Sequence, residues 1–414
     1  MENADMSTSQ FEQTLINKLA EIDANGALKG REKIITAIKP PENGKGPRYF
    51  IEGQGDKAFI RMNSNAYLGL ARHEGLVKAE EAAVRAYGTG PGAVRFISGT
   101  YQPHIQLEKR LARFHNREAA MIFSSAYATI MGLLPPFIDS ETAVISDALN
   151  HNCIINAIRL SRPLLKGIYA HLDMAGLEAQ IKAAVGQAKR VLIVTDGIFS
   201  MRGDYAPLAA ITDLASRYDA EFAEGILTVV DDSHGVGAFG KTGRGTIEYT
   251  GAQGVDILVA TLGKAFGVNG GYLVASAPIV AYLRETAPFY IYSNPITPGE
   301  AEAACKALEI IDSPEGQGRL EHLRTLTKRF EQGLMDLGFE VIPSEHPVVP
   351  LMVRDSARTE EIVQHLITNG ILATGLNYPV VPKGDEEIRF QVSAEHTQAD
   401  IDYVLAVLKV YQQN

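Results

Sequence analysis

Polar residues follow several short apolar runs in the middle of the sequence, at positions where they could do chemistry together. Asp147 and His151 follow one run, Asp231 and His234 follow a second, and Lys264 follows a third. If the runs are parallel strands, their carboxyl ends meet at one rim, where open α/β sheets bind ligands. A lysine amine can form a Schiff base with a carbonyl cofactor, and pyridoxal 5'-phosphate also needs a carboxylate at its pyridine nitrogen. We therefore predict a pyridoxal 5'-phosphate site.

The phosphate of such a cofactor needs hydrogen-bond donors, and the start of a helix supplies them. Residues Ser124–Tyr127 lie where an apolar run ends and a helical pattern begins. This stretch is therefore a candidate phosphate-binding segment.

Three other chemistries fit these residues less well. A metal site of Asp231, His234 and His151 would lack a tight ligand spacing and would leave Lys264 without a role, so we predict no metal. A serine hydrolase needs a G-x-S-x-G elbow, which the sequence lacks. Gly235–Gly240 has the spacing of a dinucleotide-binding loop, but an acidic pair and a histidine precede it where the phosphate turn should begin.

The elements that must position these residues alternate between apolar runs and helical patterns. Helical patterns such as 172–185 and 208–218 lie between runs of strand length, most of them rich in valine, isoleucine or leucine. This alternation is typical of an α/β domain with a mostly parallel, buried sheet. The strand-length runs are 120–124, 143–146, 191–195, 227–230, 257–260 and 271–275.

The pattern changes near Pro295–Pro298 and differs again at the start of the chain. After that change the sequence shows helical patterns and short strand candidates. Before the alternating region it shows a helical pattern, then a break rich in proline and glycine, and then a hairpin or pair of strands at 48–62. We predict three segments. They are 1–65, an N-terminal helix and short strands that pack with the small domain; 66–298, the large cofactor domain; and 299–414, a small α+β domain. The helices predicted in the small domain are 300–311, 320–337 and 397–411. Its predicted strands are 340–342, 348–353, 371–374 and 388–392.

The composition is that of an ordinary globular protein. The 414 residues carry 39 lysines and arginines against 49 aspartates and glutamates, a net charge of −10, which argues against binding nucleic acid. Only two cysteines, Cys153 and Cys305, are present, so a disulfide scaffold is excluded and a reducing compartment is favoured. Because we find neither a secretory signal nor an apolar run of membrane-spanning length, we expect a cytoplasmic protein.

Ordered motifs along most of the chain resemble those of the α-oxoamine synthases, pyridoxal-phosphate enzymes with the type I aminotransferase fold. The stretch Thr261–Gly267, which contains Lys264, carries the most weight. The resemblance implies a pyridoxal-phosphate-dependent C-acyltransferase that forms a homodimer with shared active sites. The other matching motifs are 65–70, 94–100, 146–151, 195–201, 231–237 and 388–390.

Two stretches point to a branch of this family. Val94–Thr100 and Tyr378–Gly384 are most similar to glycine C-acetyltransferases, so the resemblance implies that glycine and acetyl-CoA are condensed with release of CoA. Gly267–Gly271 is more similar to 5-aminolevulinate and 8-amino-7-oxononanoate synthases. A longer acyl-CoA, or alanine or serine as the amino donor as in serine palmitoyltransferase, therefore stays open, and an aminotransferase or a non-catalytic relative is a weaker alternative.

The resemblance also implies a role for each matched residue. Lys264 is the Schiff-base lysine and moves protons at the substrate α-carbon, Asp231 pairs with the pyridine nitrogen, and His234 bonds the ring hydroxyl. His151 stacks on the cofactor ring, and Arg389 binds the substrate carboxylate through its planar guanidinium. The remaining predicted residues are Ser200 at the ring hydroxyl, Thr261, Ser125, Ala126 and Tyr127 at the phosphate, Ser293 and Asn294 at the partner subunit's phosphate, and Asn65 beside the substrate carboxylate.

Overall fold

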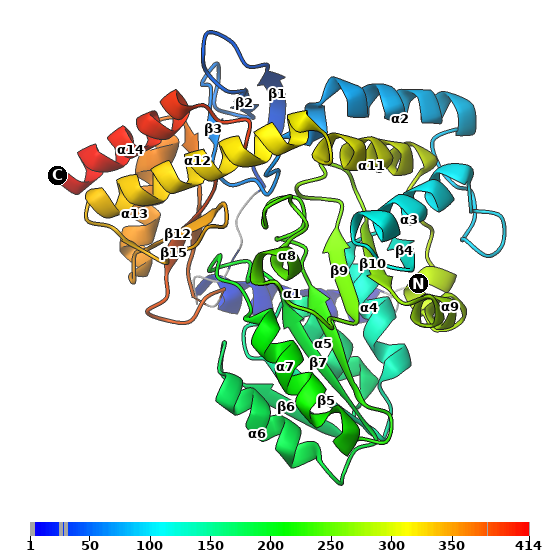
Figure 1. Cartoon of the computed structure of the whole chain (residues 1–414). Coiled ribbons are helices and arrows are strands. Elements are labelled where there is room, and N and C mark those ends of the chain that lie inside the picture. Colours follow the sequence, from blue (N-terminus) through cyan, green and yellow to red (C-terminus); the bar gives the residue numbers. More distant parts are fainter. Residues whose placement is uncertain (1–4, 25–27, 29–31, 379, 414) are drawn as a thin grey trace.

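A seven-stranded sheet forms the centre of the computed structural model, which describes residues 5–24, 28, 32–378 and 380–413 (Figure 1). Its strand order is β4-β10-β9-β8-β7-β5-β6. All strands run parallel except β10, which is antiparallel to both of its neighbours. The strands are β4 (Ala119–Phe123), β5 (Thr142–Asp147), β6 (Leu165–Tyr169), β7 (Arg190–Asp196), β8 (Ile226–Asp231), β9 (Ile257–Thr261) and β10 (Gly271–Ala275).

The six predicted apolar runs are all strands of this sheet, and β6 is the strand that the sequence did not predict. Lys166 and Ile168 are exposed in β6, whereas Gly167 and Tyr169 are buried. The strand lies at the edge of the sheet, so one of its faces is open to water and its sequence lacks a continuous apolar run.

Helices cover both faces of the large sheet. In β7, Val191 and Ile193 belong to one apolar cluster and Leu192 and Val194 to another, because successive side chains of a strand point to opposite faces. The first cluster includes side chains of α6 (Met174–Ala184) and α7 (Leu208–Tyr218). The second includes side chains of α4 (Ala126–Phe137), α5 (Asn152–Ser161) and α9 (Ala277–Thr286).

A smaller antiparallel sheet is built from the C-terminal part of the chain, in the order β11-β12-β15-β14. Its strands are β11 (Glu340–Val341), β12 (Val348–Met352), β14 (Thr374–Leu376) and β15 (Glu387–Gln391). α12 (Pro314–Asp336), α13 (Ser356–Thr368) and α14 (Gln398–Gln413) accompany it, and α12 extends from this sheet toward α11 (Pro298–Ile311) in Figure 1. The helices and strands predicted after residue 298 are present within about six residues of their expected bounds, except that 371–374 forms two short strands, 371–372 and β14, in different sheets and that α13 was not predicted.

The two strands within 48–62, β2 (Arg48–Ile51) and β3 (Ile60–Arg61), pair mainly with other segments rather than with each other. β2 forms a hairpin with β1 (Ile35–Lys39), and β3 runs parallel to β13 (Ile371–Leu372), which ties the two ends of the chain together. Within 48–62, two strands are therefore present, joined only by an isolated bridge between Tyr49 and Phe59.

The remaining helices adjoin the large sheet or the start of the chain. α1 (Asp5–Ala24) covers the predicted N-terminal helix, and its side chains from Ser9 onward are exposed, so its predicted packing with the small domain stays a prediction. Residues 1–4 of the predicted 1–65 segment, like Pro379 of the 378–384 motif, lie outside the described residues. The others are α2 (Glu74–Tyr87), α3 (Gln102–Phe114), α8 (Thr246–Thr250), α10 (Pro288–Ile291) and the 3-10 turns Leu70–Arg72 and Asp219–Glu221.

The segment boundaries themselves stay predictions. α11 begins at the proposed boundary at residue 298, but it packs against α2 and α3, which belong to the predicted large domain. In the part of the chain that the structure describes, we find no helix with the length and apolar character that crossing a membrane requires.

A buried ion cluster joins α3 to the loop before it and to α9. The Glu108 carboxylate accepts hydrogen bonds from Arg95 at 3.1 Å and from Arg284 at 2.9 Å. The side chains of Arg95 and Glu108 are 2% and 7% exposed, so neither charge can be satisfied by water if its partner is removed. The cluster therefore fixes α3 and α9 beside β4, whose Ile122 amide also donates to Glu108.

Replacing Glu108 with alanine should lower the free energy of unfolding by about 3–5 kcal/mol, because the Arg95 guanidinium stays buried without an anion. Denaturant unfolding followed by circular dichroism measures the change. Glu309→Ala is the matched control, since its contact with Lys306 lies at the surface and should contribute less than about 1 kcal/mol. Equal losses in the two variants would contradict the proposed burial effect.

Candidate active site

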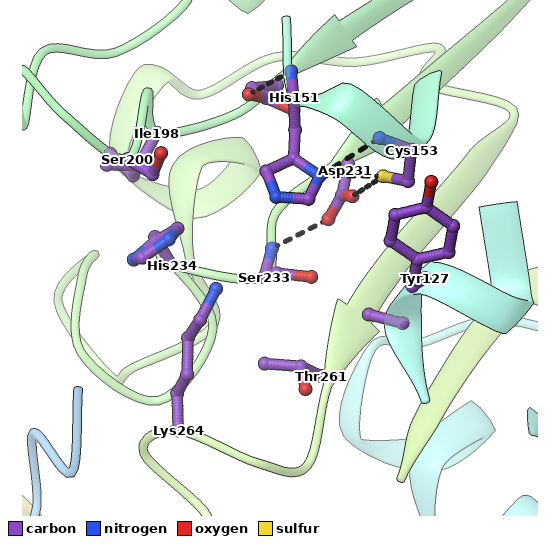
Figure 2. A pocket seen from close by; sticks show the side chains of 12 residues that line it. Tyr127, His151, Cys153, Ile198, Ser200, Asp231, Ser233, His234, Thr261 and Lys264 are labelled. Carbon is purple, nitrogen blue, oxygen red and sulfur yellow. Dashed lines mark hydrogen bonds between the residues drawn. The ribbon is translucent and has the colours of Figure 1, made fainter. Parts of the chain in front are cut away.

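A pocket opens at the carboxyl ends of β7, β8 and β9 and collects most of the predicted site residues (Figure 2). Its position agrees with the expectation that strand ends share one rim. The predicted residues that line it are Lys264, Asp231, His234, His151, Ser200, Thr261, Ala126 and Tyr127. Four further lining residues, to which the sequence assigned no role, are Asp196, Ser233, Cys153 and Ile198.

Two carboxyl groups lie side by side at the end of the central strands. Asp196 and Asp231 are direct partners in the parallel register of β7 and β8. Burial, and then the neighbouring Asp231, raise the pKa of Asp196 well above its usual range. Asp231 accepts hydrogen bonds from the Ser233 amide at 3.1 Å and, at 3.9 Å, from the Cys153 thiol.

Lys264 projects from the loop that follows β9, and its amine points into the pocket (Figure 2). The loop is closed by the Val268 amide, which donates to the Leu262 carbonyl at 3.0 Å, and by a left-handed Gly267 with φ of 72°. Burial lowers the pKa of Lys264 to about 8, although Asp231 acts in the opposite direction. A sizeable fraction of the amine is therefore neutral, and so nucleophilic, near neutral pH.

His151 begins α5, and backbone contacts fix its ring. Its Nδ1 accepts a hydrogen bond from the Cys153 amide at 3.2 Å, and its own amide donates to Asp196 at 3.1 Å. Figure 2 shows the ring facing into the pocket. Burial lowers the pKa of His151, so the ring is neutral and can lie flat against an aromatic ligand without an uncompensated charge.

His234 is held in position by hydrogen bonds to residues from two distant parts of the chain. Its Nδ1 lies 2.7 Å from the hydroxyl of Tyr67, and its carbonyl accepts a hydrogen bond from Nε2 of His346 at 2.9 Å. Burial, and then the charge of Lys264, lower the pKa of His234 well below its usual range. A neutral His234 whose Nδ1 is engaged keeps Nε2 available for a ligand in the pocket.

Arg389 and Asn65 lie next to the pocket rather than on its wall. Arg389 lies on β15 and donates through Nε to the carbonyl of Ser200 and through Nη2 to Asn65 at 3.3 Å. Ser200 lines the pocket, so the guanidinium is one residue removed from it. The geometry is compatible with the predicted carboxylate-binding role, which stays a prediction.

The last predicted residues lie at the phosphate end and outside the pocket. Ser125 caps α4 by accepting a hydrogen bond from the Ala128 amide at 3.0 Å, directly before the lining residues Ala126 and Tyr127. Ser293 and Asn294 follow α10 and do not line the pocket of this chain; Asn294 is exposed. Their predicted contact with a partner subunit stays a prediction.

The residues of the pocket fit pyridoxal phosphate by the chemistry of their donors. Ser233 Oγ is buried there without a hydrogen-bond partner, so a polar ligand group would satisfy it. A Cβ on Gly271 would come within 2.2 Å of the Ala126 amide nitrogen, so only glycine lets β10 approach the N-terminus of α4. An amine, a carboxylate, an unpaired hydroxyl and a helix N-terminus are the groups that a phosphorylated pyridine aldehyde needs. Among the described residues, no group of histidine, cysteine and acidic side chains has a metal-binding arrangement.

Comparisons with known proteins identify the family of the chain. The profile of the family described as aminotransferase class I and II matches residues 57–408. An 8-amino-7-oxononanoate synthase from Thermosipho melanesiensis is 39% identical over 90% of this chain and 92% of its own. A 2-amino-3-ketobutyrate coenzyme A ligase from Escherichia coli is also 39% identical, over 95% of each chain. Among solved structures, a serine palmitoyltransferase from S. paucimobilis has a TM-score of 0.86 at 24% identity and covers 98% of each chain.

The chain therefore belongs to the class I and II aminotransferase family and has the type I fold of its pyridoxal-phosphate enzymes. Within that family it is an α-oxoamine synthase, since relatives of two such activities match it over nearly its full length. The predicted family, fold class and cofactor are confirmed. The two activities occur at the same identity, so the comparisons do not favour one substrate pair.

The loop between β6 and α6 contributes a histidine that joins two loops of the site. His171 bonds Asp147 at 3.0 Å through Nδ1 and Asp204 at 3.2 Å through Nε2. Asp147 begins the segment that leads to His151, and Asp204 closes the segment that contains Ser200. Burial acts to lower the pKa of His171, but the two carboxylates outweigh it and raise the pKa to about 9.

The first prediction for the site is a pH dependence of cofactor uptake, because burial lowers the pKa of Lys264 and so makes its neutral, nucleophilic form accessible near neutral pH. The cofactor-free enzyme should incorporate pyridoxal phosphate faster as pH rises through about 8, where Lys264 loses its proton. Stopped-flow absorbance of the bound cofactor measures this rate. Lys264→Ala is the control and should lose the covalent component; a rate that stays flat from pH 7 to 9 would contradict the prediction.

The second prediction concerns the charge of His171. A folded pKa of about 9 lies above the unfolded value of about 6.5, so the stabilisation is complete below pH 6.5 and is lost as pH rises toward and through 9. The loss should be about 1–2 kcal/mol, because solvent screens part of the interaction. Denaturant unfolding at pH 6.5 and pH 9 should therefore differ more for the native protein than for His171→Gln. An identical pH dependence in both would refute the assignment.

Proposed function

We propose that this enzyme condenses a small amino acid with an acyl-CoA and releases CoA, and that glycine and acetyl-CoA are its substrates. The observation that carries the proposal is the convergence of Lys264, Asp231, His234 and His151 in one pocket, with Arg389 beside it. The choice of glycine and acetyl-CoA is supported by the motifs Val94–Thr100 and Tyr378–Gly384 and by the Escherichia coli ligase relative. Pyridoxal phosphate, when bound, supplies an electron-withdrawing ring that stabilises negative charge at the substrate α-carbon.

Each residue of the site has a defined task in this reaction. Asp231 would hold the positive charge at the ring nitrogen, His151 would cover the ring, and Arg389 would bind the amino-acid carboxylate. Lys264 would hold the cofactor aldehyde before substrate arrives and would then take a proton from the α-carbon, for which its lowered pKa of about 8 is well suited. His234 would donate from Nε2 to the acyl carbonyl oxygen as the new carbon–carbon bond forms and the thiolate of CoA leaves.

The phosphate side and the partner subunit complete the proposal. Ser125, Ala126, Tyr127 and Thr261 would hold the phosphate in the same subunit. Ser293 and Asn294 would reach the phosphate in the partner subunit, so the enzyme would be a homodimer with shared sites.

A second candidate has other substrates and also releases the carboxylate of the amino acid as CO2. Relatives from several organisms, including Thermosipho melanesiensis and Bacillus pumilus, carry the name 8-amino-7-oxononanoate synthase at 36–41% identity. This supports a longer acyl-CoA and alanine as the donor. The fold and the pocket serve both candidates equally, so the substrates must be tested directly.

A matrix of substrates tests the proposal. Glycine, alanine and serine are each combined with acetyl-, pimeloyl- and palmitoyl-CoA, and the released thiol is measured. We expect glycine with acetyl-CoA to exceed every other pair in kcat/KM by at least about tenfold, equal to about 1.4 kcal/mol of transition-state preference. A preference for alanine and a long thioester would establish the second candidate instead. Amino-group transfer to a 2-oxo acid without thiol release would overturn both, and Lys264→Ala controls for background thioester hydrolysis.

A further inference from the structure

A second cavity, of about 250 Å³, adjoins the active-site pocket through Ser200. It lies between the strand-end loops of the large sheet and the strands β12 and β15 of the small sheet. Most of its wall is apolar, formed by Leu149, Phe199, Met201, Met352, Val380 and Val381. A ligand in this cavity would therefore reach the pocket past Ser200 and meet apolar side chains along most of its length.

One polar group in the wall of the cavity is unexplained by the fold. The side chain of Glu387 lines the cavity, the residue is 2% exposed, and its Oε1 has no hydrogen-bond partner. Burial raises the pKa of Glu387 to about 8, although Arg389 acts in the opposite direction. The group is therefore mainly a neutral carboxylic acid at neutral pH, which can both donate and accept a hydrogen bond. A buried acceptor without a partner is costly and calls for a ligand group.

We propose that this cavity holds the pantetheine arm of the acyl-CoA and that Glu387 hydrogen-bonds an amide of that arm. The inference rests on the proposed function, which requires an acyl-CoA, and it names the site for one part of that substrate. An amide offers a donor and an acceptor, as does the Glu387 carboxylic acid, and the methyl and methylene groups of the arm match the apolar wall.

Other parts of the substrate match the cavity less well. An alkyl chain would leave the Glu387 oxygen without a partner. A terminal carboxylate would meet the side chain of Asp385, which is also in the lining. The arm also has a reason to end at the pocket, because its thiol carries the acyl group that must pass Ser200 to reach Lys264. Arg202 is also in the lining, where its Nε donates to Asp204 at 2.9 Å.

The neighbouring Glu386 provides a matched control. It directly precedes β15, and its carboxylate accepts hydrogen bonds from the Gly384 amide at 2.9 Å and from the Ser356 hydroxyl at 3.3 Å. Glu386 does not line the cavity. A change there alters the adjacent residue of the same type without touching the proposed site.

The test measures binding of CoA and of pantetheine to the cofactor-loaded enzyme by calorimetry. Glu387→Met should weaken both by about tenfold, the loss of one hydrogen bond, while Glu387→Gln, which keeps a donor and an acceptor, should stay within about threefold of the native protein. Glu386→Gln should leave both affinities unchanged. The KM for the amino acid should be the same in all variants, because Arg389 and not Glu387 is assigned to its carboxylate.

Unchanged binding of CoA and pantetheine by Glu387→Met overturns the proposal, as does a raised KM for the amino acid alone. The visible absorption of the bound cofactor verifies that each variant is folded. If Glu387→Met does not fold, Val381→Trp fills the cavity from another segment and should weaken CoA at least about tenfold; native affinity then overturns the proposal. A native enzyme that binds pantetheine yet turns over no thioester would refute the proposed function and leave the cavity assignment standing.

Discussion

The register of two buried parallel strands is the constraint on which the active site depends. β7 and β8 pair so that Asp196 and Asp231 lie side by side at their ends. Burial and the neighbouring Asp231 raise the pKa of Asp196 well above its usual range. Asp196 accepts the hydrogen bond of the His151 amide, and Asp231 lines the pocket beside it. A slip of one strand would separate the pair and move His151.

The site also depends on the small sheet, which holds the rim from the other side. His346 and Arg389 reach from that part of the chain to the carbonyls of His234 and Ser200. Tyr67, from the segment before α2, bonds the ring of His234. Because these contacts converge on the loops that carry the chemistry, a movement of the small sheet would alter both the pocket and the cavity that contains Glu387. The pairing of β3 with β13 limits such movement by tying the two chain ends together.

Sequence reasoning predicts those features that local patterns determine. The central strands are recognisable because burial on both faces demands continuous apolar runs. The edge strand β6 has one face open to water, so it lacks such a run and was not predicted. The rule that ligands bind at strand ends was sufficient to find Lys264, Asp231, His234 and His151, and it could also have included Asp196 and Ser233 on position alone. Tyr67 and His346 could not be found in this way, since their role comes from packing between segments that are far apart in the sequence. The substrates are still less accessible, because one rim serves several acyl-CoA and amino-acid pairs.

The net charge of −10 makes the local arrangement of donors decisive for binding. The ligands of the proposed reaction are anionic, so the overall field opposes their approach. At physiological ionic strength this repulsion is screened beyond about 8 Å, whereas contacts inside a pocket are screened much less. The start of α4 and Arg389 can therefore outweigh a larger number of distant surface carboxylates. Burial raises the pKa of Glu387 to about 8, so its side chain is mainly neutral at neutral pH. Glu387 can therefore hydrogen-bond an anionic substrate without adding a negative charge that would repel it.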